Sequence, residues 1–244
     1  MLYRLCQGSK GTYRLVLVVR YVIHPGGTDG PVTPLVTCPQ FEQRLERFNG
    51  ASEDQRDDQR DEVLYVLEGS ATATFAGDTH ALEPGTGVFI ARATPWRIDT
   101  SDGLLLLCVF VEDPLEAGSS HAVVPAGERG VATAGREFAL LAQPENGCES
   151  VTQFVGYIPQ GRAPDHFHRY DEVVYILEGK GAFHVGGESE PLQPGSAIHL
   201  PAELVHCLEN HGPGEMRVLG VFRPAGSPAE AYYPDGTAAV VPAV

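Results

Sequence analysis

The sequence has few basic residues and no long hydrophobic run. Its 17 Lys and Arg stand against 32 Asp and Glu, which gives a formal net charge of −15. A surface of that sign repels phosphate backbones, so nucleic acid is not an expected partner. No run of roughly 18 apolar residues could cross a membrane, and residues 1–6 lack the pattern of a secretory signal. We therefore expect a cytoplasmic protein, without a membrane partner, that acts on a small molecule.

Cysteine is sparse and scattered, and it forms no Cys-x-x-Cys pair. This argues against a cysteine zinc site and against a disulfide framework. In a reducing cytoplasm the default is a set of free thiols. The five positions are Cys6, Cys38, Cys108, Cys148 and Cys207.

Glycine and proline are plentiful, with 28 and 19 copies, and they separate short runs of β-branched residues. This pattern favours many short strands joined by tight turns, so the predicted fold class is all-β. Residues 41–48 alone have much helical character. The strands predicted in the first half are 14–23, 63–67, 87–91 and 104–111, and those in the second half are 151–158, 172–177, 181–185, 196–200 and 217–222.

The chain contains an internal duplication. The segment DEVLYVLEG at residues 61–69 recurs as DEVVYILEG at residues 171–179, an offset of 110 that also carries Gly77 onto Gly187. Such a repeat indicates two domains of similar fold. We place them at residues 1–115 and 136–244, joined by a connector at 116–135, and the second includes a turn-rich tail at residues 223–237. Because residues 41–48 fall on the strand predicted at 151–158, a strand is preferred there too.

Four side chains in the second copy predict a metal site. His166 and His168 are two residues apart, so on an extended strand they point to the same face. Glu172 follows four residues later, and His206 completes the set if the chain folds back. Three imidazoles and a carboxylate suit iron, manganese, nickel, copper, cobalt or zinc, and they leave two positions of a six-coordinate ion free. We predict one divalent transition metal per chain, bound by His166, His168, Glu172 and His206.

The first copy has lost this ligand set. The offset of 110 places Arg56, Asp58, Glu62 and Trp96 at the four positions. A guanidinium and an indole offer no lone pair to a metal, so the first domain is predicted to hold none. Its pocket is either filled by Trp96 or closed by an Arg56 pair with Asp58 or Glu62. Alternatively, Arg56 binds an anionic ligand.

The spacing of the second copy resembles the two signature motifs of the cupin superfamily. One block runs Gly-x4-His-x-His-x3-Glu-x6-Gly over residues 161–179, and the other runs Gly-x5-Pro-x-Glu-x2-His-x3-Asn over residues 195–210. Glu203 departs from the glycine usual in the family, and the first gap is one residue shorter than the commonest form. The resemblance implies a bicupin, with two tandem double-stranded β-helix (jelly-roll) barrels and the metal inside the second.

The resemblance narrows the function without fixing it. Three His and one Glu are similar to the sites of quercetin-type dioxygenases and of manganese oxalate enzymes. We expect a metal-dependent oxidoreductase of dioxygenase type acting on an enol, diketone, aromatic or carboxylate substrate. Glu172 would then be catalytic as well as a ligand, because the matching Glu in related enzymes accepts a proton. The alternatives are a non-catalytic binding cupin, or a metal-dependent isomerase, decarboxylase or aminohydrolase.

The pocket walls should distinguish among substrates. Apolar and aromatic walls would favour aromatic or diketone substrates, whereas arginine would favour a small acid. Arg162 and Arg169 flank the ligands in the sequence. For the oligomeric state, two fused barrels are compatible with a monomer or a homodimer. The candidate wall residues are Gln153, Tyr157, His184 and His199.

Overall fold

The computed structural model describes residues 2–7, 13–18, 21–26, 30–125 and 127–239. Within these ranges the chain consists of β-strands and loops with two short 3-10 turns, Thr133–Gly135 and Pro144–Asn146. The all-β prediction is therefore confirmed. The strand predicted at 14–23 contains β2 (Tyr13–Val18) and β3 (Val22–Ile23), and residues 19–20 lie outside the described part.

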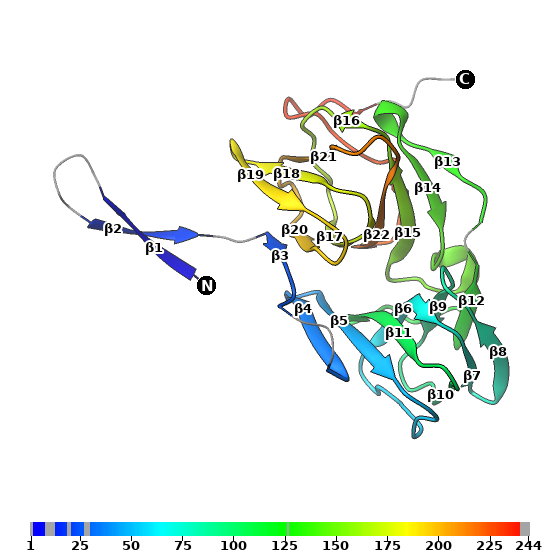
Figure 1. The fold of residues 1–244 in the computed structure, drawn as a ribbon. Helices are drawn as coiled ribbons and strands as arrows, with labels where there is room; N and C mark the ends of the chain where they lie inside the picture. The colour runs from blue at the N-terminus through cyan, green and yellow to red at the C-terminus, as the bar shows by residue number, and fades with distance from the viewer. Residues whose placement is uncertain (1, 8–12, 19–20, 27–29, 126, 240–244) are drawn as a thin grey trace.

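Two barrels follow one another along the chain, and the first occupies the lower part of Figure 1. One of its sheets has the strand order β12-β9-β6-β11-β5-β4, and the other has the order β10-β7-β8. The bounds are β4 Val32–Thr37, β5 Phe41–Phe48, β6 Asp61–Gly69, β7 Ala71–Phe75, β8 Asp78–Leu82, β9 Gly87–Ile90, β10 Trp96–Asp99, β11 Leu104–Val111 and β12 His121–Val124.

The second barrel repeats this arrangement, with sheets β13-β14-β15-β22-β17-β20-β3 and β16-β21-β18-β19. A separate hairpin of β1 (Leu2–Gln7) and β2 stands away from both barrels in Figure 1. The remaining bounds are β13 Gly130–Val131, β14 Glu137–Leu140, β15 Thr152–Ile158, β16 Gly161–Arg162, β17 Asp171–Glu178, β18 Gly181–Val185, β19 Glu188–Leu192, β20 Ala197–Leu200, β21 His206–Asn210 and β22 Met216–Arg223.

The duplication extends to strand pairing. In the first barrel β11 pairs with β5 and β6, and in the second β22 pairs with β15 and β17 in the same antiparallel sense. Both central pairs carry a β-bulge at matching positions, beside Leu67 in β6 and Leu177 in β17. Residues 41–48 form β5, so the preference for a strand there is confirmed.

The two barrels share one apolar interface. A single buried cluster contains Val63 and Leu107 from the first barrel together with Val155 and Val173 from the second. Short strands are also exchanged: β3 extends a sheet of the second barrel, while β12, from the segment predicted as connector, extends a sheet of the first. Burial of this apolar surface is the main force that holds the barrels together.

The C-terminal tail crosses one end of the second barrel. Tyr232 pairs with Phe167 through two backbone hydrogen bonds, and their rings stack with centroids 5.5 Å apart. The tail, drawn in red in Figure 1, lies near β16. These contacts fix the tail against the barrel.

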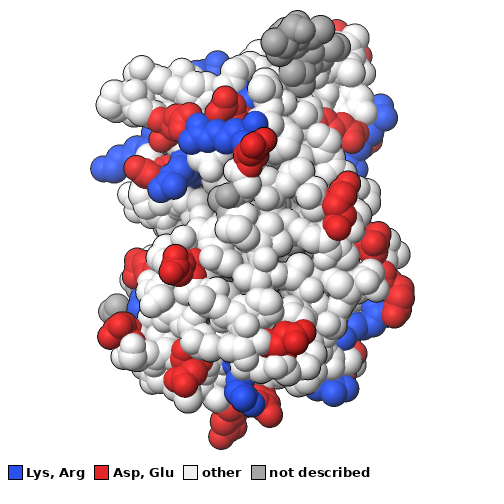
Figure 2. Space-filling model, turned by 90° about the vertical axis from the view of Figure 1, so that its right-hand side faces the viewer, with Lys and Arg blue, Asp and Glu red and all other residues white. Residues whose placement is uncertain are grey.

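Acidic side chains are scattered over the face drawn in Figure 2, and the basic side chains there form no continuous positive area. Among the described residues, no helix has the length and apolar character needed to span a membrane.

Candidate metal centre

Backbone pairing fixes the histidines opposite one another. His166 and His206 form an antiparallel bridge in which each amide donates to the other's carbonyl, over 3.0 and 2.8 Å. The amide of Glu203 donates to the carbonyl of His168 over 2.7 Å, which ties the loop before β21 to the second ligand. Glu203 has φ of 64°, in the left-handed region that favours glycine. Its place in the motif therefore requires a conformation that Glu adopts only uncommonly.

The three imidazoles converge. One ring nitrogen of each of His166, His168 and His206 lies within 4.8 Å of the others. His166 and His206 are buried and His168 is half-buried, so the group lies inside the barrel. Such a cluster has the donor type and spacing that a transition metal needs.

Hydrogen bonds set the tautomer of each ring. The Nδ1 atom of His166 lies 3.0 Å from the carbonyl oxygen of Pro164, that of His168 2.8 Å from Glu230, and that of His206 2.8 Å from Leu204. A carbonyl oxygen can only accept, so each Nδ1 carries the proton and each Nε2 keeps a lone pair. This is the outer-shell arrangement that orients metal-binding histidines.

Burial also keeps the three rings neutral. Desolvation lowers the pKa of His166 to about 4 and that of His168 to about 3, and it lowers the pKa of His206 well below its usual value. Each ring further disfavours charge on its neighbours. At neutral pH the cluster therefore presents three uncharged donors, which fit a divalent transition metal.

Glu172 occupies the same pocket but stands apart from the three close nitrogens. It lies on β17, is buried, and its Oε1 would be 2.7 Å from a Cβ placed on Gly220. Burial raises the pKa of Glu172 to about 8, and the guanidinium of Arg136 partly opposes this rise. The structure thus brings three of the four predicted ligands together and places the fourth in the wall of the pocket.

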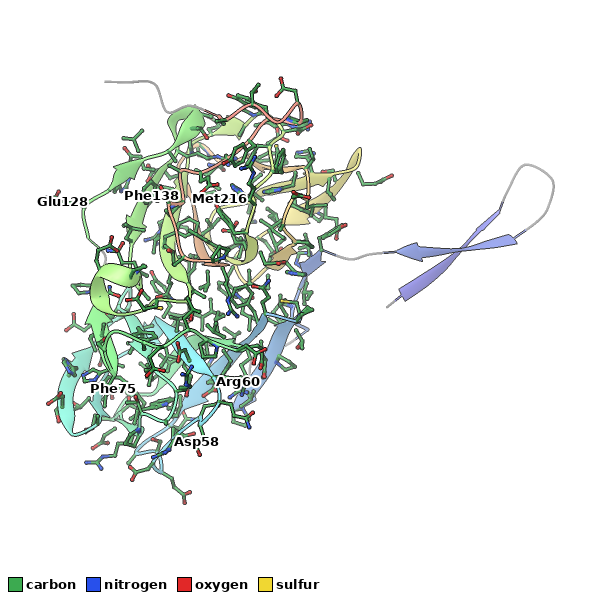
Figure 3. All side chains as sticks on the ribbon, turned by 180° about the vertical axis from the view of Figure 1, so that it is seen from behind. Asp58, Arg60, Phe75, Glu128, Phe138 and Met216 are labelled. Atoms are coloured by element: carbon green, nitrogen blue, oxygen red, sulfur yellow. The ribbon has the colours of Figure 1, made fainter. Side chains whose placement is uncertain are left out.

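The pocket beside the histidines has a volume of about 550 Å³, which includes the part open to solvent. Much of its wall is aromatic. Tyr170 stacks between His168 and Phe222, with ring centroids 4.7 and 4.0 Å away. Phe138, labelled in Figure 3, and Phe154 add further apolar area.

Of the predicted wall residues, Tyr157 does line the pocket and the other three do not. Gln153 faces the first barrel, where its Nε2 donates to the carbonyl of Leu64 over 3.3 Å. His184 pairs with Glu209, and His199 lies 3.3 Å from Asp171. The prediction was wrong for all three. For Gln153 and His199 the reason is that neighbouring residues of a strand alternate between faces, and Phe154 and Leu200 take the pocket face instead.

The arginine of the pocket was missed by sequence reasoning. Arg162 pairs with Asp165, and Arg169 lies over the ring of Tyr232. Arg136 lines the pocket instead. The repeat gave no signal for it, because the offset of 110 maps it onto Gly26 in the first copy.

In the first barrel the corresponding pocket is lined mostly by charged side chains, together with Trp96 and Phe110. Arg56 pairs with Asp58, and the indole Nε1 of Trp96 donates to Glu62 over 3.3 Å. Phe110 takes the position of Gly220, and the guanidinium of Arg44 lies 4.1 Å from its ring. Figure 3 labels Asp58 and Arg60, which lie in this barrel. The predicted pair of Arg56 with Asp58 thus occurs, but it is exposed, and Trp96 lines the pocket without filling it.

Comparison with known proteins supports the sequence resemblance. Residues 153–222 match the cupin domain family. A segment of 84 residues, 30% of this chain, is 37% identical to quercetin 2,3-dioxygenase from Bacillus subtilis, of which it covers 25%. The matches to curated relatives cover between 25% and 56% of those proteins.

Solved structures share the whole two-barrel fold. Protein YlbA from E. coli superposes with a TM-score of 0.71 at 14% identity, covering 86% of this chain and 94% of that one. Oxalate decarboxylase from Bacillus subtilis, described with Mn(II) centres, gives a TM-score of 0.68 at 15% identity, covering 87% and 79%. At these identities the likeness establishes the fold and not the activity.

Proposed function

Because this chain belongs to the cupin superfamily and folds as a bicupin, we propose that its second barrel is a metal-dependent oxidoreductase of dioxygenase type. One observation carries the proposal: three neutral imidazoles direct their free Nε2 lone pairs into an apolar pocket. The substrate would be a small organic molecule with an enol, diketone, aromatic or carboxylate group. The similarity to quercetin 2,3-dioxygenase favours oxygen chemistry over the other activities that this fold supports.

His166, His168 and His206 would hold the ion, with Glu172 as fourth ligand. When bound, a divalent transition metal would supply Lewis-acid and redox chemistry. The aromatic walls would exclude water and orient the substrate. Glu172 would hold or accept the substrate proton, because its carboxyl group lies in the wall of the same pocket.

The test combines metal analysis with oxygen uptake. Protein purified without added metal should contain about one transition-metal ion per chain, and His168→Ala should lose most of it. Glu62→Gln, at the matching position of the first barrel, should keep it. Oxygen uptake with quercetin or pentane-2,4-dione should match probe consumption and vanish in His168→Ala. Metal loss in both variants, or bound metal without oxygen uptake, would contradict the proposal.

A second candidate is a metal-dependent decarboxylase. One observation favours it: Arg136, which has no acidic partner among the described residues, lies in the pocket wall and could hold a substrate carboxylate. Glu172, when it is not bound to the ion, could deliver a proton to the carbon from which carbon dioxide has left. Release of carbon dioxide from a carboxylate probe under anaerobic conditions would favour this activity over the oxygenase.

A further inference from the structure

Arg136 enters the pocket from an edge of the second barrel. It follows the 3-10 turn Thr133–Gly135 and precedes β14, and its Nη2 donates to the carbonyl oxygen of Leu208 over 3.1 Å. Arg136 also lines a neighbouring surface groove together with Arg162. The side chain is half-buried and stands between the pocket and the surface.

The charge of Arg136 has no acidic partner among the described residues. Glu137, the next carboxylate in the pocket wall, pairs with Arg129 over 2.9 Å. Burial lowers the pKa of Arg136, and the opposing effects of Cys207 and Glu172 are weaker. A guanidinium offers five donors, and within the described part of the chain that of Arg136 forms one hydrogen bond, to Leu208. The pocket therefore presents a cation with free donors inside a protein of net charge −15.

We propose that Arg136 binds the carboxylate of an amphipathic organic acid, whose apolar body lies against Phe138, Phe154 and Tyr170 beside the three histidines. This inference rests on the proposed function in that the acid would be the substrate of the same pocket. A planar guanidinium matches a carboxylate through two parallel hydrogen bonds. The metal-binding nitrogens of the neutral histidines add no negative charge that would repel the acid.

The walls select the body of the acid. Val174, Leu200 and Val218 extend the apolar lining beyond the aromatic rings. A small diacid would leave this area in contact with water, whereas an aryl or branched alkyl group would cover it. The pocket thus fits a monocarboxylate with a hydrophobic tail better than it fits oxalate.

Calorimetric titration with 3-phenylpropionate tests this assignment. The protein is first loaded with Zn²⁺, which has no redox chemistry, so that binding is measured without turnover. We expect 3-phenylpropionate to bind more tightly than 3-phenylpropionamide and more tightly than oxalate. Arg136→Gln should lower the affinity for 3-phenylpropionate by roughly 10- to 100-fold, because charge-assisted hydrogen bonds to the carboxylate are lost. The same change should leave the affinity for the amide nearly unaltered.

Two matched variants control for folding and for general electrostatics. Arg136→Lys keeps the positive charge but cannot form the two parallel hydrogen bonds of a guanidinium. Its affinity for 3-phenylpropionate should therefore lie between those of the unmodified chain and Arg136→Gln. Arg162→Gln removes a charge from the adjacent groove but not from the pocket, and 3-phenylpropionate should then bind within about twofold of the unmodified chain. The inference is overturned by any of three results: Arg136→Gln leaves the affinity for 3-phenylpropionate unchanged, it lowers the affinity for 3-phenylpropionamide equally, or oxalate binds more tightly than 3-phenylpropionate.

The two proposals fail in distinguishable ways. If Zn²⁺ binds at the histidines but the affinity for the acid does not depend on Arg136, the substrate class is wrong and the metal site stands. If 3-phenylpropionate binding depends on Arg136 but no oxygen is consumed with any probe, the anion site stands and the oxygenase proposal is lost.

Discussion

At the scale of residues, the contrast between Gly220 and Phe110 makes the pockets of the two barrels differ. Both occupy the same position of the repeat on the central strands β22 and β11. Glycine leaves room for Phe154 and for the carboxyl group of Glu172, whereas the ring of Phe110 forms part of the pocket wall in the first barrel. This one position thus changes which side chains face the pocket in each barrel.

Gly220→Ala should close part of the pocket. An added Cβ would lie 2.3 Å from Cε1 of Phe154 and 2.7 Å from Oε1 of Glu172, so both must shift. We expect a loss of about 1–3 kcal/mol in the free energy of unfolding, typical of overpacking, and weaker metal binding. Gly226→Ala is the control, because its Cβ would meet only Cε2 of Phe222, at 3.9 Å. Urea denaturation of both variants measures the effect, and equal stability would count against the tight fit.

Glu62 should make the first barrel sensitive to pH. Burial raises its pKa from 4.5 to about 7, so the folded chain binds a proton that the unfolded chain releases. The stabilising contribution of the neutral carboxyl is complete below pH 4.5 and is lost as the pH rises through 7. The side chain of Glu62→Gln stays neutral and keeps an acceptor for Trp96. The free energy of unfolding of this variant, relative to the unmodified chain, should therefore increase by roughly 1–3 kcal/mol between pH 4.5 and 9.

Unfolding followed by the fluorescence of Trp96, the one tryptophan of the chain, measures this difference in the barrel concerned. Glu68→Gln, at an exposed position of the same strand β6, serves as the control. A stability difference for Glu62→Gln that does not change with pH would show that Glu62 is not held in its neutral form.

The histidine ligands could be predicted from the sequence, but the residues of the pocket walls could not. His166 and His168 could be predicted because their spacing places them on one face of a strand, and His206 because the second block resembles a cupin motif. Gln153 and His199 were misplaced because the facing direction of a strand depends on where the second barrel packs against the first. Arg136 could not be found, since the approach of β14 to the metal-bearing strands is a property of the folded barrel.

At the scale of elements, the C-terminal tail completes the candidate metal centre. The carbonyl of Glu230 holds the Nδ1 proton of His168, although the tail lies outside the region that matches the cupin domain. Tyr232 anchors this segment through its stacking on Phe167 and through the guanidinium of Arg169, which lies 4.1 Å from its ring. The internal duplication does not predict this contact, because the residues that make it belong to the tail and have no counterpart in the repeated motifs.

Tyr232→Ala should therefore weaken metal binding without removing a ligand. We expect a loss of up to about tenfold in metal affinity, since changes in outer-shell partners typically cost 10–100-fold and this one acts indirectly. Tyr233→Ala is the matched control, because Tyr233 is exposed and its ring makes neither contact. Competition with a chromogenic chelator gives both affinities. Equal affinities in the two variants would mean that the tail does not position His168.

The strands themselves were largely predictable, because short β-branched runs separated by glycine and proline leave few alternatives. The exchanged strands were harder to predict. β3 has two residues, and β12 lies in a segment that appeared to be only a connector. Each is a strand because an edge of a sheet offers it hydrogen bonds, which no local propensity shows.

At the scale of the whole molecule, the interface makes the two barrels depend on each other. The shared apolar cluster, the exchanged strands and the bond from Gln153 to Leu64 all cross the boundary. The second barrel produced alone, as residues 116–244, would expose that cluster and lose β3. We expect it to aggregate or to unfold at markedly lower denaturant concentration than the full chain, as judged by size-exclusion chromatography and circular dichroism. A stable monomer with normal metal content would show that the first barrel is dispensable.

The account depends most on where a metal ion binds. Crystals grown from metal-loaded protein, measured at the absorption edge of that metal, locate the ion through its anomalous scattering. We predict one anomalous peak per chain, about 2.0–2.3 Å from the Nε2 atoms of His166, His168 and His206. A peak beside Trp96 in the first barrel, or no peak among these histidines at full metal loading, would contradict it.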